Sequence, residues 1–141
     1  MSDKPFFDTN ILLYLLSADQ AKADRAEALI ADGGTISVQV LNEFAATAIR
    51  KLKMSWADVA DVLDTIRAIC PVQPLTVETH DKGRALAERY GFSVYDAMIV
   101  ASALLEDCTT LYSEDMQHGQ VVEARLTVQN PFLPATPQRE I

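Results

Sequence analysis

Short apolar runs alternate with longer stretches of helical periodicity along this chain, and the alternation restricts the folds that it can adopt. Helical segments separate the first four runs, each of which is rich in β-forming residues. Strands connected through helices form parallel sheets that carry helices on both faces. We therefore expect an α/β fold, in which two helical layers enclose a short, mostly parallel five-stranded central sheet. The expected strands are residues 4–7, 35–38, 70–75, 109–113 and 126–130.

The expected helices have apolar residues at three- and four-residue spacing and recognisable ends. Ser55, Thr76 and Ser93 are suitable N-caps, and Gly91 is a suitable helix end. Prolines bracket the run at 70–75, which places that strand at a sheet edge, because proline cannot donate a ladder hydrogen bond. The expected helices are residues 9–16, 20–31, 39–53, 55–69, 76–90 and 93–106.

Length and composition predict one folded domain. The chain has 141 residues, of which 49% are hydrophobic, so that a sizeable core can form. Its net charge of −8 argues against binding nucleic acid through a broad basic surface. A nuclease is not excluded, since a metal ion can neutralise acidic side chains locally. We expect the domain to span residues 1–133 and a polar, proline-containing tail to follow at 134–141.

The cysteines and the apolar runs indicate a protein of the cytoplasm. Cys70 and Cys108 have no second Cys or His at metal-ligand spacing, which favours two reduced thiols. The longest apolar run, 97–105, is about half the length of the roughly 18 residues that a membrane span needs. We expect a soluble, cytoplasmic protein with no membrane association.

Four acidic residues stand where the predicted strands end. Asp8 follows the first strand, Asp115 follows the fourth, Glu43 lies early in the helix after the second, and Asp96 opens the helix before the fourth. In parallel sheets ligands bind at the carboxyl ends of the strands. Carboxylates gathered there repel one another unless a cation holds them. Their oxygen atoms suit Mg²⁺ or Mn²⁺.

Each acid taken alone also has a structural explanation. Asp8 can cap the following helix, and Asp96 completes a capping box with Ser93. Glu43 lies away from the apolar stripe of its helix, and Asp115 belongs to a polar turn. The helix that Asp96 opens is apolar nearly all round, however, so that its charge faces the interior or a cleft and needs a partner.

Four segments resemble one known family when they are taken together and in order. They are "FFDTNILLYLL", "VLNEFAATAIRK", "SVYDAMIVASAL" and "TTLYSEDMQHGQ". The chain resembles the PIN-domain ribonucleases, and in particular the VapC toxins of bacterial toxin–antitoxin pairs, over residues 5–133. The resemblance implies a PIN-like three-layer α/β/α fold and a metal-dependent ribonuclease that hydrolyses RNA phosphodiester bonds with Mg²⁺ or Mn²⁺. The acids that match the catalytic and metal-binding acids of the family are Asp8, Glu43, Asp96 and Asp115.

The resemblance also implies polar residues around the metal. Asp8 and Asp96 would hold the main ion, with Glu43 and Asp115 completing the site directly or through water. Asn10, Ser37 and Ser113 match supporting positions. Glu114 precedes Asp115, and either acid could be the fourth ligand.

Partners follow from the same resemblance. VapC-like proteins act on RNA, are restrained by a cognate VapB-like antitoxin and commonly form homodimers. Arg50, Lys51 and Lys53 form the one dense basic cluster, which is either a solvated helix end or a contact to the RNA backbone.

Two other functions compete with a toxin ribonuclease. A phosphate-receiving signalling domain also gathers acids at strand ends, but it would need a lysine after a late strand, and none follows the strand at 109–113. A non-toxin nuclease of the wider PIN superfamily is the alternative among enzymes, although such members usually carry large insertions. His118 is interpreted as a loop residue.

Overall fold

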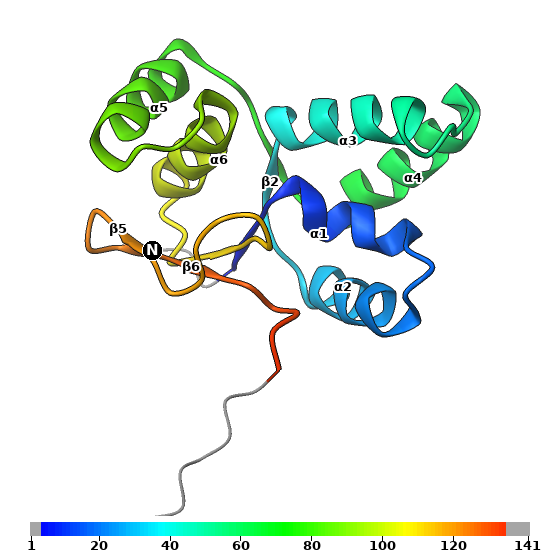
Figure 1. Cartoon of the computed structure of the whole chain (residues 1–141). Helices are drawn as coiled ribbons and strands as arrows, with labels where there is room; N and C mark the ends of the chain where they lie inside the picture. The colour runs from blue at the N-terminus through cyan, green and yellow to red at the C-terminus, as the bar shows by residue number, and fades with distance from the viewer. Residues whose placement is uncertain (1–3, 135–141) are drawn as a thin grey trace, which may run out of the picture.

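The computed structural model describes residues 4–134 and contains the predicted alternation of helices and strands (Figure 1). The predicted tail, apart from Pro134, lies outside the described residues, and the boundary at 133 stays a prediction. The helices are α1 (Thr9–Leu13), α2 (Gln20–Asp32), α3 (Val38–Arg50), α4 (Trp56–Ile69), α5 (Val77–Tyr90) and α6 (Val94–Leu105), with a 3₁₀ turn η1 at Tyr14–Leu16. The strands are β1 (Phe6–Phe7), β2 (Ile36–Ser37), β3 (Val72–Gln73), β4 (Thr110–Tyr112), β5 (Val121–Val122) and β6 (Leu126–Gln129).

The central sheet consists of two hydrogen-bonded parts. Four strands have the order β1-β4-β6-β5, and β2 pairs with β3. A parallel bridge between Phe6 and Thr35 connects the two parts. Every strand pair is parallel except β5 with β6. β3 pairs with β2 alone, at the edge that its flanking prolines predicted.

The strand count differs from the prediction, whereas the fold class is confirmed. All five predicted strands occur, and a sixth, β5, lies between β4 and β6 in the sequence. β5 has only two residues and joins β6 through a turn in which Glu123 and Ala124 both have positive φ. A pair of valines is too short to show a strand periodicity, which is why the sequence did not reveal it.

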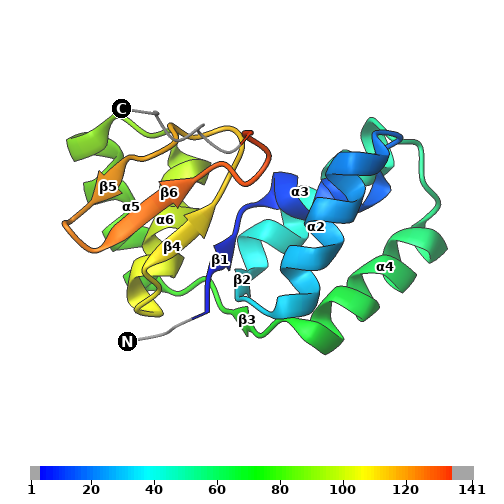
Figure 2. The same ribbon diagram turned by 90° about the horizontal axis from the view of Figure 1, so that it is seen from below.

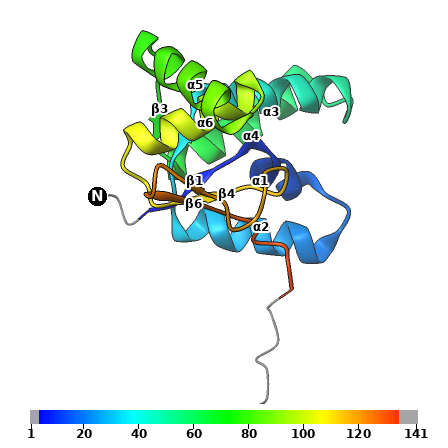
Figure 3. The ribbon, with the colours of Figure 1, turned by 60° about the vertical axis from the view of Figure 1, so that its left-hand side comes forward.

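The helices and strands form three layers. Figure 3 shows α3, α5 and α6 on one side of the strands and α2 on the other, and Figure 2 shows β4, β6 and β5 beside α5 and α6. Phe6 and Phe7 are both fully buried, because a strand covered on both faces has no solvent side. α6 is buried from Ala97 to Leu104, as its nearly continuous apolar sequence predicted.

The predicted caps are confirmed, whereas two helices end earlier than predicted: α1 ends at Leu13, where η1 begins, and α3 ends at Arg50. Lys53, which was predicted to lie in that helix, has a positive φ that a right-handed helix does not allow. Ser55, Thr76 and Ser93 each cap a helix by accepting a hydrogen bond from a backbone N–H. Gly91 ends α5 in the left-handed conformation. The two cysteines are buried thiols. Within residues 4–134, every helix is too short or too polar to cross a membrane.

Candidate functional site

Asp8 lies directly after β1, at the carboxyl end of the sheet, and is only 3% exposed. Its carboxylate accepts hydrogen bonds from the Thr9 backbone N–H at 2.7 Å, from Ser113 Oγ at 2.7 Å and from Asn10 Nδ2 at 3.2 Å. Phe7 of β1 pairs with Tyr112 of β4, so the residues that follow them, Asp8 and Ser113, lie next to each other. The parallel register therefore builds the centre of the site.

The environment of Asp8 disfavours its charge. Burial raises the pKa of this carboxyl to about 7, from an ordinary 3.8. The hydrogen bonds from Ser113 and Thr9 lower the pKa, whereas the negative charges of Asp96 and Glu43 raise it. All three donors to Asp8 are neutral groups, so they stabilise the ion without balancing its charge.

Glu43 from α3 and Asp96 from α6 approach the same place. Glu43 accepts a hydrogen bond from Thr9 Oγ1 at 2.9 Å. Burial raises the pKa of Glu43, and the charges of Asp96 and Asp115 raise it further. Burial also raises the pKa of Asp96, to which the charge of Asp115 adds. The four acids thus share one electrostatic environment, and Glu43 is half-buried rather than the solvated side chain that its helical position suggested.

Asn10 connects the acid after β1 with the acid after β4. Its Nδ2 donates to Asp8 Oδ2 at 3.2 Å and to Asp115 Oδ2 at 3.0 Å. Its Oδ1 accepts from the Glu114 backbone N–H at 3.1 Å. The amide therefore holds the turn after β4 against the start of α1.

The Glu114 side chain has a different set of partners. It accepts hydrogen bonds from the Tyr14 hydroxyl and from Lys22 Nζ, the latter at 3.0 Å. Burial by itself would raise the pKa of Glu114, but the hydrogen bonds from Tyr14 and Lys22 and the charge of Lys22 bring it below its ordinary value. Glu114 is thus a paired anion, whereas Asp115 is the acid of this turn that shares Asn10 with Asp8.

Several residues around the site fall outside the sequence-based prediction. Thr9 contacts two of the acids through its backbone and its hydroxyl, and the "DTN" motif was its one visible signal. Tyr14 and Lys22 are far from Glu114 in the sequence, so no local pattern could predict that they pair with it. Ser37, by contrast, was among the predicted supporting residues; it is fully buried and caps α3, where its Oγ accepts from the Val40 N–H at 3.4 Å. Ser37 therefore fixes the start of the helix that carries Glu43.

Two hollows flank the acids on either side of α3, and Thr47 lines both. The polar hollow has a volume of about 390 Å³ and the apolar hollow about 380 Å³. Arg50 lines the polar hollow and Lys51 the apolar one, so α3 divides the basic cluster between them. Lys53 is exposed beyond the end of α3. The polar hollow is lined by Gln39, Asn42, Glu43, Ala46, Thr47, Arg50 and Tyr95. The apolar hollow is lined by Asn10, Leu13, Tyr14, Leu16, Ser17, Thr47, Lys51, Leu52, Glu114 and Asp115.

The donor set of the site fits a hard divalent cation. Carboxylate oxygens are ligands that Mg²⁺ and Mn²⁺ prefer. A cation would offset the repulsion among these acids, which helps to raise the pKa values of Asp8, Glu43 and Asp96. In the part of the chain that the structure describes, no three Asp, Glu, His or Cys side chains enclose a ready-made metal cage. An ion here would take few protein ligands directly and keep several waters, as Mg²⁺ usually does.

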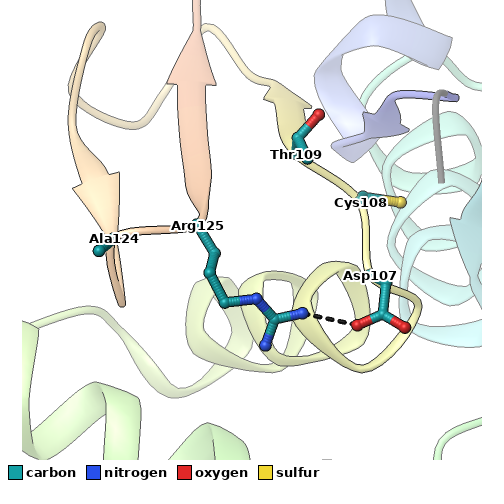
Figure 4. A pocket seen from close by; sticks show the side chains of 5 residues that line it. All are labelled: Asp107, Cys108, Thr109, Ala124 and Arg125. Atoms are coloured by element: carbon teal, nitrogen blue, oxygen red, sulfur yellow. Dashed lines mark hydrogen bonds and ion pairs between the residues drawn. The ribbon is translucent and has the colours of Figure 1, made fainter. Parts of the chain in front are cut away.

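A third hollow, at the opposite end of the sheet, has a different electrostatic character (Figure 4). It has a volume of about 360 Å³ and lies where β4 and β6 begin. Arg125 Nη2 donates to Asp107 Oδ1 at 2.6 Å and to the Leu104 carbonyl at 3.4 Å. The acid here is balanced by a base. His118 likewise has a structural contact, because its Nδ1 accepts from the Asn130 backbone N–H at 2.9 Å.

Comparison with known proteins gives one family and a consistent fold. The sequence pattern of the PIN domain matches residues 6–123. No curated protein matches the chain.

Three similar solved structures come from bacterial toxin–antitoxin systems. A toxin–antitoxin complex from Klebsiella pneumoniae shares 20% identity over 92% of this chain and 98% of the other, with a TM-score of 0.70. VapC20 from Mycobacterium tuberculosis, described as a sarcin–ricin loop cleaving toxin, shares 21% identity over 79% and 90%, with a TM-score of 0.65. VapBC2 from Rickettsia felis, bound to a promoter DNA fragment, shares 19% identity over 89% and 97%, with a TM-score of 0.58. At these identities the likeness shows the fold.

Proposed function

The chain belongs to the PIN-domain family, and we propose that it is a Mg²⁺- or Mn²⁺-dependent endoribonuclease that acts as the toxin of a VapBC-type pair. The observation that carries the proposal is the gathering of Asp8, Glu43, Asp96 and Asp115 at the carboxyl ends of the strands. Three of them have raised pKa values, partly through one another's charges. Such a cluster suits a bound cation and phosphate chemistry.

Asp8 and Asp96 would hold the main ion, and Glu43 and Asp115 would complete the site directly or through water. When bound, the ion lowers the pKa of a water for attack on phosphorus and offsets negative charge on the phosphoryl oxygens. Ser113 and the Thr9 N–H orient the Asp8 carboxylate, and Thr9 Oγ1 orients Glu43. Asn10 keeps Asp8 and Asp115 on the same side of the sheet.

The toxin role rests on the kind of protein that shares this fold at nearly full length. The Klebsiella and Rickettsia structures are toxin–antitoxin complexes, and VapC20 is described as a toxin that cleaves the sarcin–ricin loop. We propose by analogy that this chain cleaves RNA in the cytoplasm, is restrained by a VapB-like antitoxin and forms a homodimer.

The test is cleavage of RNA by the purified protein. We expect cleavage that requires Mg²⁺ or Mn²⁺ and is abolished reversibly by chelator. Asp8→Asn and Asp96→Asn should each reduce the rate at least about 100-fold while the circular dichroism spectrum is retained. Asp107→Asn, an acid at the opposite end of the sheet, is the matched control and should cleave like wild type. Full activity in either of the first two variants would refute the assignment.

The biological role is tested by expression in a bacterial host. Induction of the wild-type chain should arrest growth, and induction of Asp8→Asn should not. Growth arrest that persists in Asp8→Asn at equal protein level would separate the toxicity from the acidic site.

A further inference from the structure

The polar hollow follows one side of α3. Gln39, Glu43, Ala46 and Arg50 recur at three- and four-residue spacing, so they line the same side of the helix. Tyr95, in the first turn of α6, closes the hollow from the neighbouring helix, and Figure 1 shows α6 beside the start of α3. The hollow thus begins at the acids and leads away from them toward the end of α3.

Three kinds of polar group line the polar hollow: a carboxylate, a guanidinium and side-chain amides. Glu43 belongs to the acidic site, and Arg50 lies two turns further along α3, a rise of about 10 Å between the two backbone positions, and adds a guanidinium to the lining. Asn42 presents an exposed amide, and the Gln39 amide hydrogen-bonds to Glu43. Between them Ala46 has only a methyl group, which leaves the floor of the hollow open. The volume of about 390 Å³ lies within the range of small-ligand sites, roughly 300–1,000 Å³.

Tyr95 is the unusual member of this lining. Its side chain is 64% exposed, although it directly precedes Asp96, one of the four acids. An exposed tyrosine often has no role beyond solubility and surface cover. Here, however, its ring shares a hollow with a guanidinium and two amides. Aromatic rings beside such groups bind unpaired bases by stacking, while arginine contacts the phosphate.

We propose that the polar hollow binds one unpaired nucleotide of single-stranded RNA next to the bond that the acids cleave. The base stacks on Tyr95, Asn42 hydrogen-bonds to the edge of the base, and Arg50 contacts the phosphate. The proposal rests on the ribonuclease function proposed above, because the acids define where the strand is cut. Amide and charged groups favour a nucleotide over an apolar protein segment in this hollow. With a net charge of −8, the chain depends on a local contact of this kind instead of a basic surface.

The first experiment measures binding of a short, labelled single-stranded RNA pool by fluorescence anisotropy. Ca²⁺ replaces Mg²⁺, and a gel verifies that the RNA stays intact. Tyr95→Ala should weaken binding roughly tenfold, and Tyr95→Phe, which keeps the ring, should bind like wild type. Val94→Ala is the matched control, since Val94 is exposed in the same turn but does not line the hollow. If Tyr95→Ala binds RNA like wild type, the proposal is wrong. It is also wrong if Tyr95→Ala elutes from size-exclusion chromatography with a different oligomeric mass from wild type, because the hollow would then be a protein interface.

The second experiment detects stacking directly. Trp56 is the one tryptophan of the chain and is exposed at the start of α4. In the double variant Trp56→Phe and Tyr95→Trp, the one indole lies in the hollow, and RNA should quench its fluorescence. In the wild-type protein RNA should leave the Trp56 signal unchanged. An unquenched indole in a double variant that binds RNA would overturn the stacking assignment.

The third experiment separates phosphate binding from general charge. Arg50→Gln should weaken RNA binding. In a plot of the logarithm of the binding constant against the logarithm of the salt concentration, the slope should become shallower by about 0.7, the value for one phosphate contact on a single strand. Arg67→Gln removes an exposed charge at the end of α4, away from the hollow, and should leave the slope unchanged. Equal slopes in wild type and Arg50→Gln would contradict the contact. A wild-type chain that neither cuts nor binds RNA refutes the ribonuclease function itself, whereas wild-type cleavage with unaffected Tyr95 variants refutes this inference alone.

Discussion

The two ends of the central sheet treat acidic side chains in opposite ways. At the amino ends of β4 and β6, Asp107 pairs with Arg125 at 2.6 Å, and nearby Glu123 pairs with Lys82 at 2.6 Å. At the carboxyl ends of β1 and β4, Asp8 has neutral donors and the charges of other acids around it. The first arrangement balances charge within the chain, and the second leaves a charge to be balanced by something else.

This difference indicates that the unbalanced acids at the carboxyl ends of the strands lower the stability of the folded state. Paired surface acids contribute little in either direction, typically 0–1 kcal/mol. A buried acid with a raised pKa disfavours the folded state whenever it is ionised. Strained or unbalanced groups of this kind concentrate at functional sites. The following predictions test the contrast, beginning with the largest expected effect.

The metal-free protein should lose stability as the pH rises toward neutrality. The pKa of Asp8 is about 7 in the folded state and ordinarily 3.8, so the folded state binds the proton more tightly between these values. The stabilising contribution of protonated Asp8 is complete below about pH 4 and is lost as the pH rises through 7. The full difference approaches about 4 kcal/mol. Urea unfolding in chelator, for wild type and Asp8→Asn, measures it: the wild-type stability should fall relative to the variant, and parallel curves would contradict the assignment.

Adding Mg²⁺ or Mn²⁺ should reverse part of this loss. A cation at the acids binds only the folded state and stabilises it, by about 2.7 kcal/mol at a hundredfold excess over its Kd. The melting temperature of wild type at pH 7 should rise with the metal concentration, and that of Asp8→Asn should rise much less. Asp107→Asn, whose change lies at the amino end of the sheet, should respond like wild type.

Removing the Ser113 hydroxyl should weaken the support of Asp8. Ser113→Ala deletes the 2.7 Å hydrogen bond that lowers the pKa of Asp8, so this pKa should rise further. We expect a loss of about 1–2 kcal/mol of stability at pH 8 and a 10- to 100-fold loss of metal affinity. Calorimetric titration with Mn²⁺ measures the second effect, and unchanged affinity would show that the hydroxyl does not orient the carboxylate.

The turn after β4 allows a direct comparison of neighbouring acids. Glu114→Gln weakens the ion pair with Lys22 and should lower the free energy of unfolding by about 1 kcal/mol while cleavage stays within a few-fold of wild type. Asp115→Asn should do the reverse, with little loss of stability and a clear loss of cleavage. The opposite outcome would identify Glu114 as the fourth acid.

The smallest effect is expected at the amino ends of the strands. The Arg125 and Asp107 side chains are both about half exposed, so Arg125→Ala should change stability by no more than about 1 kcal/mol. Thermal unfolding at low and high salt checks this, because salt screens an exposed pair. A loss of several kcal/mol would show that both ends of the sheet depend on charge to a similar degree.

Local signals in the sequence predicted most of the fold. Caps such as Ser55 and Thr76 and the apolar surface of α6 depend on residues a few positions apart, so they are visible in a single sequence. β5 escaped because two residues carry no periodicity. The acids stood out because they follow the predicted strands, and the resemblance singled out the same four residues. The structure adds that they share one electrostatic environment.

The remaining features depend on contacts between distant parts of the chain. The Lys22–Glu114 pair and the place of Tyr95 in a hollow lined by α3 follow from how the elements pack, and no local pattern encodes them. Thr9 looked like part of a helix start, and its second contact, to Glu43, required α3 to be placed. The spacing of residues along the chain therefore predicted the candidate site residues, whereas their contacts with distant residues depend on how the helices and strands pack.

The pairing of β1 with β4 also determines when the centre is assembled during protein synthesis. Ser113 and Asp8 are 105 positions apart, yet they share a 2.7 Å hydrogen bond. A nascent chain that has not yet received β4 presents Asp8 without Ser113 and without Asp115. The acids can therefore come together only after β4 and the turn that follows it have been synthesised, and a shorter nascent chain would lack the acidic centre.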